Sequence, residues 1–239
     1  MQYIPKKIHY CWFGNNEKSE LVNKCISSWK DKLPDYEIIE WNEKNFDFNC
    51  NDYIREAYEN KKWAFVSDFV RLYVLYEYGG IYLDTDVEVI KSFDSLLENK
   101  SFIGFESLDE NITGVLTATI GSEKNNKIIK MLLDSYKNRK FIVNGKMDLT
   151  TNVQTITKKL QKTYSIKLEN HEQYIEDNLM TIYPSDYFCP KNAVTQLKLT
   201  ENTYSIHHFD GSWVSKKEKI RIEVIYRIKK FLKKFRIIQ

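Results

Sequence analysis

Several features that would assign a chain to a particular class are scarce or missing from this sequence. Glycine and proline number only 8 and 4 in 239 residues, so no segment has the composition of a flexible linker. The four cysteines, Cys11, Cys25, Cys50 and Cys189, form no C-x-x-C pair and occur in apolar or helical surroundings. We therefore expect reduced thiols in the core of a cytosolic protein.

Long apolar runs and a strong net charge are also missing. Lys6, Lys7 and His9 interrupt the residues after Met1, so no secretion signal is visible, and no window reaches the apolar length of a membrane span. A net charge of +3 argues neither for nor against nucleic acid, and nothing else points to a nucleic-acid partner. We expect a cytoplasmic protein built around one large domain.

The most informative segment is 79–87, in which two glycines and an apolar run lead into Asp84-Thr85-Asp86. Alternation along an extended strand places Asp84 and Asp86 on the same side, so their oxygens can converge on one ligand. Mg²⁺ and Mn²⁺ prefer oxygen ligands and keep positions open for phosphate. Such triplets also occur in solvated acidic loops, but the aliphatic run and the glycine pair favour a metal-diphosphate site, which indicates nucleotide-sugar chemistry.

A helix that is apolar on nearly every side is predicted directly before this segment, over residues 62–78. Such a helix is typically buried, yet it contains Asp68 and Arg71 three positions apart on one face. A buried charge is costly unless it is paired, so these side chains should contact each other, a ligand, or both. A purely structural ion pair is the alternative. The position of the helix beside the carboxylate pair favours a shared pocket.

The rest of the chain alternates between strands and helices. Further strands are predicted over 4–13, 36–41, 87–90, 102–106, 115–120, 181–183 and 204–208, and further helices over 17–31, 52–59, 126–136 and 148–160. This alternation predicts an α/β sandwich, in which ligands bind at the carboxyl ends of strands. Asp84 and Asp86 follow such an end.

The last segment of the chain is strongly basic. Residues 216–236 contain ten lysines and arginines against two glutamates, with apolar residues at helical spacing. A basic amphipathic helix suits an anionic membrane surface, but the same pattern fits a helix packed on the domain with a solvated basic face. We therefore divide the chain into a domain over 1–213 and a basic amphipathic helix over 214–239. If this helix binds the membrane, the protein would be peripheral on its inner face; both alternatives stay open.

Four motifs occur in the order found in one enzyme family. They are residues 4–14 (IPKKIHYCWFG), 67–71 (SDFVR), 79–86 (GGIYLDTD) and 207–213 (HHFDGSW). With them the sequence resembles glycosyltransferase family 32, the sugar-binding regions containing a DXD motif, which include capsular polysaccharide transferases and initiation-specific mannosyltransferases. The order is also similar to that in the catalytic domain of the large clostridial glucosylating toxins. The resemblance extends to Trp213 and is tighter over the first hundred residues.

The resemblance implies a GT-A fold with a mixed central sheet flanked by helices, a Mn²⁺ or Mg²⁺ cofactor, a nucleotide-sugar donor and retention of anomeric configuration. It also implies roles for single residues. As the catalytic set, Asp68 and Arg71 would hold sugar hydroxyls, Asp84 would contact ribose or donor sugar near the metal, and Asp86 would ligate the metal. As substrate-binding residues, Trp12 would stack on the base, Tyr82 would line the nucleotide site, Asn152 would contact the donor sugar and Trp213 would close over the diphosphate.

One departure from the toxins concerns the third metal ligand. Where the toxins carry a carboxylate before the closing tryptophan, this chain has His208, in a His-x-x-Gly pattern similar to that of other retaining GT-A enzymes whose histidine binds the metal. We therefore expect His208 to join Asp84 and Asp86 at the metal. The other histidines, His9, His171 and His207, are expected to be structural or surface residues.

The function implied is transfer of a hexose from a UDP- or GDP-sugar to a glycan or lipid-linked oligosaccharide, in surface or capsular polysaccharide synthesis. Negative charge grows on the leaving diphosphate, where a metal ion stabilises it. No dedicated carboxylate nucleophile is evident in the sequence. We therefore favour front-face transfer, assisted by the leaving phosphate, over a double displacement.

Two other functions compete with this interpretation. A glycoside hydrolase needs two carboxyls that face each other across the scissile bond, roughly 5 to 9.5 Å apart, and not two that project side by side from one strand. A catalytically inactive nucleotide-sugar or glycan-binding protein of the same fold would bind donor without turnover. No signature position is visibly lost, and the ordered motifs favour the enzyme.

Overall fold

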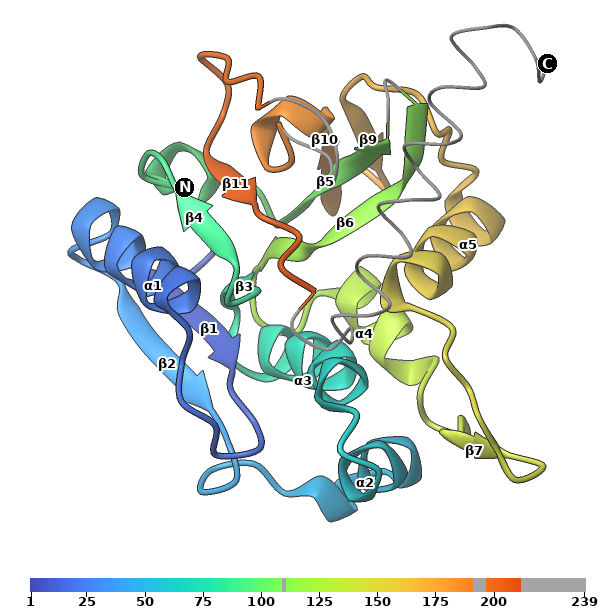
Figure 1. The fold of residues 1–239 in the computed structure, drawn as a ribbon. Coiled ribbons are helices and arrows are strands. Elements are labelled where there is room, and N and C mark those ends of the chain that lie inside the picture. Colours follow the sequence, from blue (N-terminus) through green and yellow to red (C-terminus); the bar gives the residue numbers. More distant parts are fainter. Residues whose placement is uncertain (109–110, 191–196, 212–239) are drawn as a thin grey trace, which may run out of the picture.

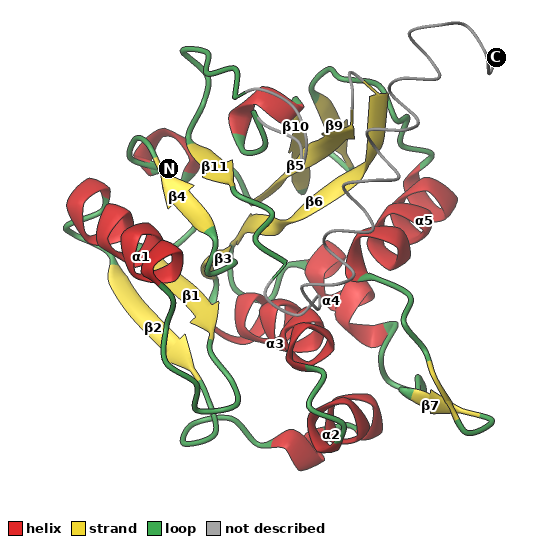
Figure 2. Cartoon of the chain, viewed as in Figure 1, coloured by secondary structure: helices red, strands yellow, loops and turns green. Residues whose placement is uncertain are grey.

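A computed structural model describes residues 1–108, 111–190 and 197–211 of the chain. Its centre is a seven-stranded sheet in the order β2-β1-β3-β6-β5-β10-β9 (Figure 1). These strands are β1 (Lys7–Cys11), β2 (Glu37–Trp41), β3 (Gly80–Leu83), β5 (Ser101–Leu108), β6 (Asn111–Ser122), β9 (Gln173–Ile175) and β10 (Met180–Tyr183). Two small sheets pair β4 (Val87–Val89) with β11 (Ser205–His207) and β7 (Ile142–Val143) with β8 (Lys146–Met147). The helices, red in Figure 2, are α1 (Glu20–Lys32), α2 (Asp52–Glu59), α3 (Trp63–Tyr78), α4 (Lys127–Asp134) and α5 (Asn152–Tyr164).

The central sheet is mixed. β1 runs parallel to β2 and β3, and β10 runs parallel to β5, whereas β6 is antiparallel to both β3 and β5. The prediction of an α/β fold with a mixed central sheet flanked by helices is confirmed. Of the six predicted helices, the five that fall within the described residues are present as α1 to α5. β7, β8 and β9, which are two or three residues long, were not predicted.

Two buried clusters lie on the two faces of the sheet. One contains side chains of α2, α3, α4 and α5, and the other contains side chains of α1 and β4. β3 contributes to both, since Ile81 and Leu83 enter the α1 cluster whereas Tyr82 enters the α3 cluster. A strand buried on both faces needs a continuous apolar run, which explains the sequence before the two aspartates.

Two glycines connect α3 to β3 and set where this strand ends. Gly79 and Gly80 both adopt positive φ, at 64° and 114°. A Cβ on Gly79 would lie 2.8 Å from the Lys124 amide nitrogen, and a Cβ on Gly80 would lie 2.8 Å from the Lys7 carbonyl oxygen. Only glycine fits both the backbone conformation and the space. The tight connection brings the end of α3 next to β1 and directs β3 toward the turn that contains Asp84 and Asp86.

His9 of β1 holds the same connection from inside the core. Its Nε2 lies 2.8 Å from the Gly79 carbonyl oxygen, and the Trp41 indole donates to its Nδ1 at 3.1 Å. The ring is fully buried, and burial lowers the pKa of His9 from 6.5 to about 4. These contacts fix a neutral imidazole with its proton on Nε2, so His9 is a structural residue, as expected.

The buried neutral His9 predicts a pH-dependent stability. Because its pKa is lower in the folded chain, the unfolded chain binds the extra proton, and stability is lost as pH falls from 6.5 toward about 4. We expect His9 to contribute about 1.4 kcal/mol per pH unit in this window. The measurement is the free energy of unfolding against pH in the wild type and in His9→Gln. An equally steep decline in His9→Gln would contradict the assignment.

Some of the sequence-based expectations are untested or wrong. Trp213 and the basic helix predicted over 214–239 lie outside the described residues, so the domain boundary stays a prediction. Cys11, Cys25 and Cys189 are buried and form no disulfide, but the expectation of a core thiol is wrong for Cys50, which ends a surface 3₁₀ turn and is exposed. None of the helices in the described part of the chain has the length and apolar character needed to cross a bilayer.

Candidate active site

Asp84 and Asp86 lie in the turn that joins β3 to β4. The Val87 amide donates to the Asp84 carbonyl at 3.0 Å and closes this turn, and the Asp84 amide donates to Ala118 of β6 at 2.9 Å. Ligand atoms of the two carboxylates and of His207 all lie within 4.8 Å of one another. The two aspartates do converge, as expected. However, they are brought together by a tight turn, whereas we expected the alternation of side chains along one continuous strand.

His207 is the side chain that faces Asp86. β11 runs antiparallel to β4 and places His207 opposite Val87, with its Nε2 3.4 Å from Asp86 Oδ1. The second oxygen of Asp86 accepts from the Asp210 amide at 2.8 Å. Burial alone would raise the pKa of Asp86, but His207 and the Asp210 amide lower it, and Asp86 in turn raises the pKa of His207 against the effect of burial. The two side chains are partly buried, and each favours the charged form of the other.

His208 points elsewhere. Its Nε2 lies 2.8 Å from a carboxylate oxygen of Glu88, which also accepts from Lys24 at 2.8 Å. Successive side chains of a strand point to opposite sides, so His207 and His208 cannot both face Asp86. The structure brings His207 to the two aspartates, whereas we expected His208 there and His207 to be structural. The deciding signal is the register of β11 against β4, which the sequence does not display.

Arg71 of α3 connects the two acidic parts of the site. Its guanidinium donates to Asp68 at 3.0 Å and approaches both oxygens of Asp84 at 3.3 Å. It also donates to the Thr117 carbonyl at 2.6 Å, and it lies 4.7 Å from the centre of the Tyr82 ring. Only 4% of Arg71 is exposed. The charged pair predicted within the apolar helix therefore belongs to the same site as Asp84.

Asp68 and Asp84 share the one positive charge of Arg71, so this charge stabilises the ionised form of Asp68 less than it would in a simple pair. Burial raises the pKa of Asp68 to about 6, although Arg71 opposes the rise. Asn152, the first residue of α5, donates to the Asp68 carbonyl at 3.4 Å and accepts from the Tyr136 hydroxyl at 3.2 Å. Asn152 is thus brought to Asp68 from a distant part of the sequence.

The predicted substrate-binding aromatic residues differ in accessibility. Tyr82 is 1% exposed and its hydroxyl donates to Asp84 at 3.0 Å, so it supports the carboxylate from within the core. Trp12 follows the end of β1, beside β3, and is half-buried. Its indole donates to the Asn16 carbonyl at 2.8 Å, and Lys18 lies 5.4 Å from the ring centre. Trp12 is at the strand edge where a ligand of this sheet would bind.

Residues 19–103 match a family described as the glycosyltransferase sugar-binding region containing DXD motif. This segment includes Asp68, Arg71, Asp84 and Asp86, but neither His207 nor Asn152. The mixed sheet flanked by helices confirms the predicted α/β fold class, and the family match agrees with the GT-A arrangement that the resemblance implies.

Curated proteins with similar sequences include several from fungi and one from a bacterium. Inositol phosphoceramide mannosyltransferase 3 of Schizosaccharomyces pombe is 35% identical over 107 residues, covering 42% of this chain and 29% of the relative. Subversion of eukaryotic traffic protein A of Legionella pneumophila is 30% identical over 167 residues, covering 55% and 25%. Mannosyl phosphorylinositol ceramide synthase CSH1 of Saccharomyces cerevisiae is 30% identical over 146 residues, covering 58% and 37%. The chain therefore spans well under half the length of each of these relatives.

Solved structures with a similar chain course are also glycosyltransferases. PaToxG glycosyltransferase aligns with a TM-score of 0.49 and 24% identity, covering 67% of this chain and 70% of that one. The galactosyltransferase LgtC aligns with a TM-score of 0.41 and 14% identity, covering 76% and 74%.

Proposed function

We propose, on the premise that residues 19–103 belong to the glycosyltransferase sugar-binding regions containing a DXD motif, that this protein is a metal-dependent, retaining hexosyltransferase. The donor would be a UDP- or GDP-sugar and the acceptor a glycan or a lipid-linked saccharide. The observation that carries the proposal is the convergence of Asp84, Asp86 and His207 beside a buried arginine. Because several of the similar proteins are named as mannosyltransferases, mannose is the first sugar to test.

The residues fit a divalent cation. Two carboxylates and one imidazole suit Mn²⁺ well and Mg²⁺ less well, since Mg²⁺ favours oxygen ligands. The buried Nδ1 of His207 has no hydrogen-bond partner in the part of the chain that the structure describes. A ligating imidazole must be neutral, so His207 would hold the ion only in its neutral form. When bound, such an ion would stabilise the negative charge that grows on the leaving diphosphate.

The protein's own side chains would position the donor. Arg71 is buried and already bonded to Asp68, Asp84 and a backbone carbonyl, so it orients the two carboxylates. Above its pKa of about 6, Asp68 can accept hydrogen bonds from sugar hydroxyls. Trp12 offers a partly exposed aromatic face to the base. Since all three carboxylates of the site carry protein contacts, we favour front-face transfer over a double displacement.

The direct test is a donor screen. Purified protein with Mn²⁺ is incubated with UDP- and GDP-sugars, and release of nucleoside diphosphate and binding of donor are measured in parallel. We expect release with one donor and loss of release when the metal is chelated. Donor binding without release, with and without saccharide acceptors, would indicate a binding protein. A role in capsular polysaccharide synthesis and a place at the inner face of the membrane stay predictions.

The two neighbouring histidines should differ in their effect on the metal. We expect His207→Gln to raise the Mn²⁺ concentration for half-maximal activity by at least about tenfold, because it removes one of three candidate ligands. His208→Gln should change it by less than about twofold, since His208 contacts Glu88. Mn²⁺ binding measured by electron paramagnetic resonance checks both variants without relying on activity. A larger shift for His208→Gln would restore the ligand set expected from the sequence.

A further inference from the structure

A small hairpin stands away from the central sheet. β7 and β8 are joined by Asn144 and Gly145, both at positive φ, 51° and 73°, as in the two-residue turns that Asn-Gly favours. A Cβ added to Gly145 would meet no atom within 4 Å. In Figure 1 the hairpin projects outward at the lower right, to the right of α2 and below α5. The turn at its tip is therefore accessible to solvent and to a binding partner.

Three large apolar side chains are exposed on and beside this hairpin. Val143 is 50% exposed, Met147 40% and Leu149 58%. In the described part of the chain only nine large hydrophobic side chains are exposed to this degree, and three of them occur within these seven residues. Apolar groups gathered on a projecting element cost free energy in water, which points to a partner that covers them.

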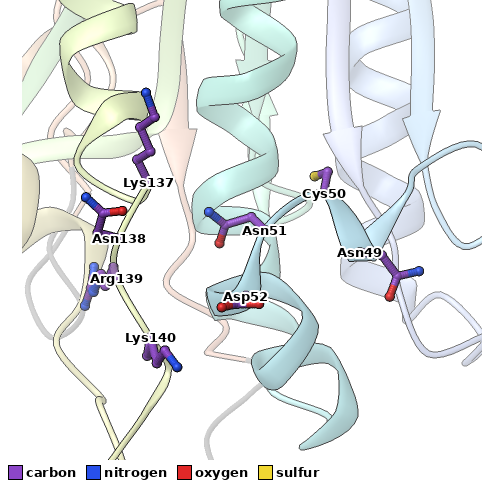
Figure 3. Close-up of a pocket in the computed structure, with 8 residues that line it drawn as sticks. All are labelled: Asn49, Cys50, Asn51, Asp52, Lys137, Asn138, Arg139 and Lys140. Atoms are coloured by element: carbon purple, nitrogen blue, oxygen red, sulfur yellow. The ribbon is translucent and has the colours of Figure 1, made fainter.

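The hairpin is surrounded by positive charge. Residues 137–162 contain seven lysines and arginines and one aspartate, so this stretch is more positive than the whole chain, whose net charge is +3. Lys137, Arg139 and Lys140 line one side of a hollow of about 360 Å³ (Figure 3). A second hollow, of about 370 Å³, is lined by Arg139 together with Lys158, Lys159 and Lys162.

The acidic side chains nearby are already engaged. Asp148 pairs with Arg139 at 2.8 Å, and Glu56 accepts from the Phe141 and Ile142 amides, both at 2.8 Å. Asp52 pairs with Arg55 at 2.6 Å. Glu56 keeps its negative charge, but within the described residues none of the five lysines that line the two hollows forms an ion pair with an acidic side chain.

We propose that this hairpin and its lysines dock on the surface of an anionic lipid bilayer. A bilayer supplies an apolar layer for the side chains at the tip and phosphate groups for the cations around them. A second copy of this chain is a poor occupant, because two such positive surfaces would repel each other. This docking surface is distinct from the C-terminal segment 216–236, so the two can be separated by substitution.

The hairpin is close in sequence to the candidate active site. α5 begins just beyond Leu149, and its first residue, Asn152, donates to the Asp68 carbonyl. The hairpin is thus connected by a few residues to the helix that contacts the Asp68 backbone. The docking itself does not depend on the proposed transferase activity.

The test is sedimentation of the full-length protein with phosphatidylcholine vesicles that contain or lack phosphatidylserine. We expect binding to the anionic vesicles and a loss of at least about tenfold in V143S/M147S/L149S. K158E/K159E should lose about tenfold, because each lysine near the surface contributes to the attraction. A matched control, Y174S/L197S/L199S, removes three other exposed apolar side chains and should bind like the wild type.

Several results would overturn the proposal. Equal binding of V143S/M147S/L149S and the wild type would assign docking to another segment, and failure of the wild type to bind anionic vesicles would exclude it. Donor cleavage in solution should be unchanged in the hairpin variant, which separates this failure from failure of the proposed function. In case that variant does not fold, an environment-sensitive fluorophore on Val143→Cys in a Cys50→Ser background should shift to the blue on anionic vesicles. The same label on Tyr174→Cys should not shift, and no shift at residue 143 would also refute docking.

Discussion

Replacing Asp86 by asparagine is expected to lower the rate of hexose transfer by about 1,000-fold or more, because the metal would lose a charged ligand and its hold on the diphosphate. The Asp86 carboxylate connects the acidic turn to the segment around β11, because it faces His207 and accepts from the Asp210 amide. An asparagine oxygen can still accept from that amide. The substitution therefore removes the charge and preserves the shape of the turn.

The matched control for this substitution is Glu88→Gln. Glu88 lies two residues further along the same segment and accepts hydrogen bonds from His208 and Lys24. It is not one of the three residues whose ligand atoms converge on the candidate metal site. We expect its rate to stay within about threefold of the wild type, as for a surface ion pair. Steady-state rates over a range of Mn²⁺ concentrations, with thermal unfolding to check the fold, give the comparison. Similar losses in both variants would show that the acidic cluster acts through folding and not through a metal.

The acidic turn was predictable because its signals are local. The apolar run, the two glycines and Asp84-Thr85-Asp86 are contiguous, and each requirement is met within a few residues. The pairing of Asp68 and Arg71 was predictable for the same reason, since three positions along a helix place two side chains on one face. Local spacing therefore predicted the part of the candidate site that one helix and one strand supply.

The remaining part depends on contacts between distant segments. Whether His207 or His208 faces Asp86 is decided by the register of β11 on β4, and a shift of one residue would exchange them. Asn152 could be placed only through the resemblance, because α5 is positioned by tertiary packing. The hairpin at 142–147 showed no period in the sequence, and its exposed apolar residues look like core residues until the fold is known.

Arg71→Met is expected to cost about 3 to 5 kcal/mol of folding stability, because it removes the cation that compensates the buried carboxylate of Asp68 and the partly exposed carboxylate of Asp84. The side chains of Arg71 and Asp68 are only 4% and 12% exposed, so water cannot solvate the Asp68 carboxylate in place of the guanidinium. Burial already raises the pKa of Asp68 to about 6. A carboxyl with a raised pKa favours the folded state when protonated, so the cost should grow as pH rises through 6 and shrink below it.

The control for Arg71→Met is Arg55→Met, which breaks an ion pair of the same helical spacing with Asp52. That pair is 40% and 50% exposed, so its loss should cost less than about 1 kcal/mol although its 2.6 Å contact is the shorter one. Chemical denaturation at two pH values on either side of 6 measures both variants, and adding Asp68→Asn to Arg71→Met should recover part of the stability. Equal costs for the two arginines would mean that water reaches the Arg71 site. The rigid positioning that we propose for Asp68 and Asp84 would then have no physical basis, since a hydrated guanidinium would be free to move with the substrate.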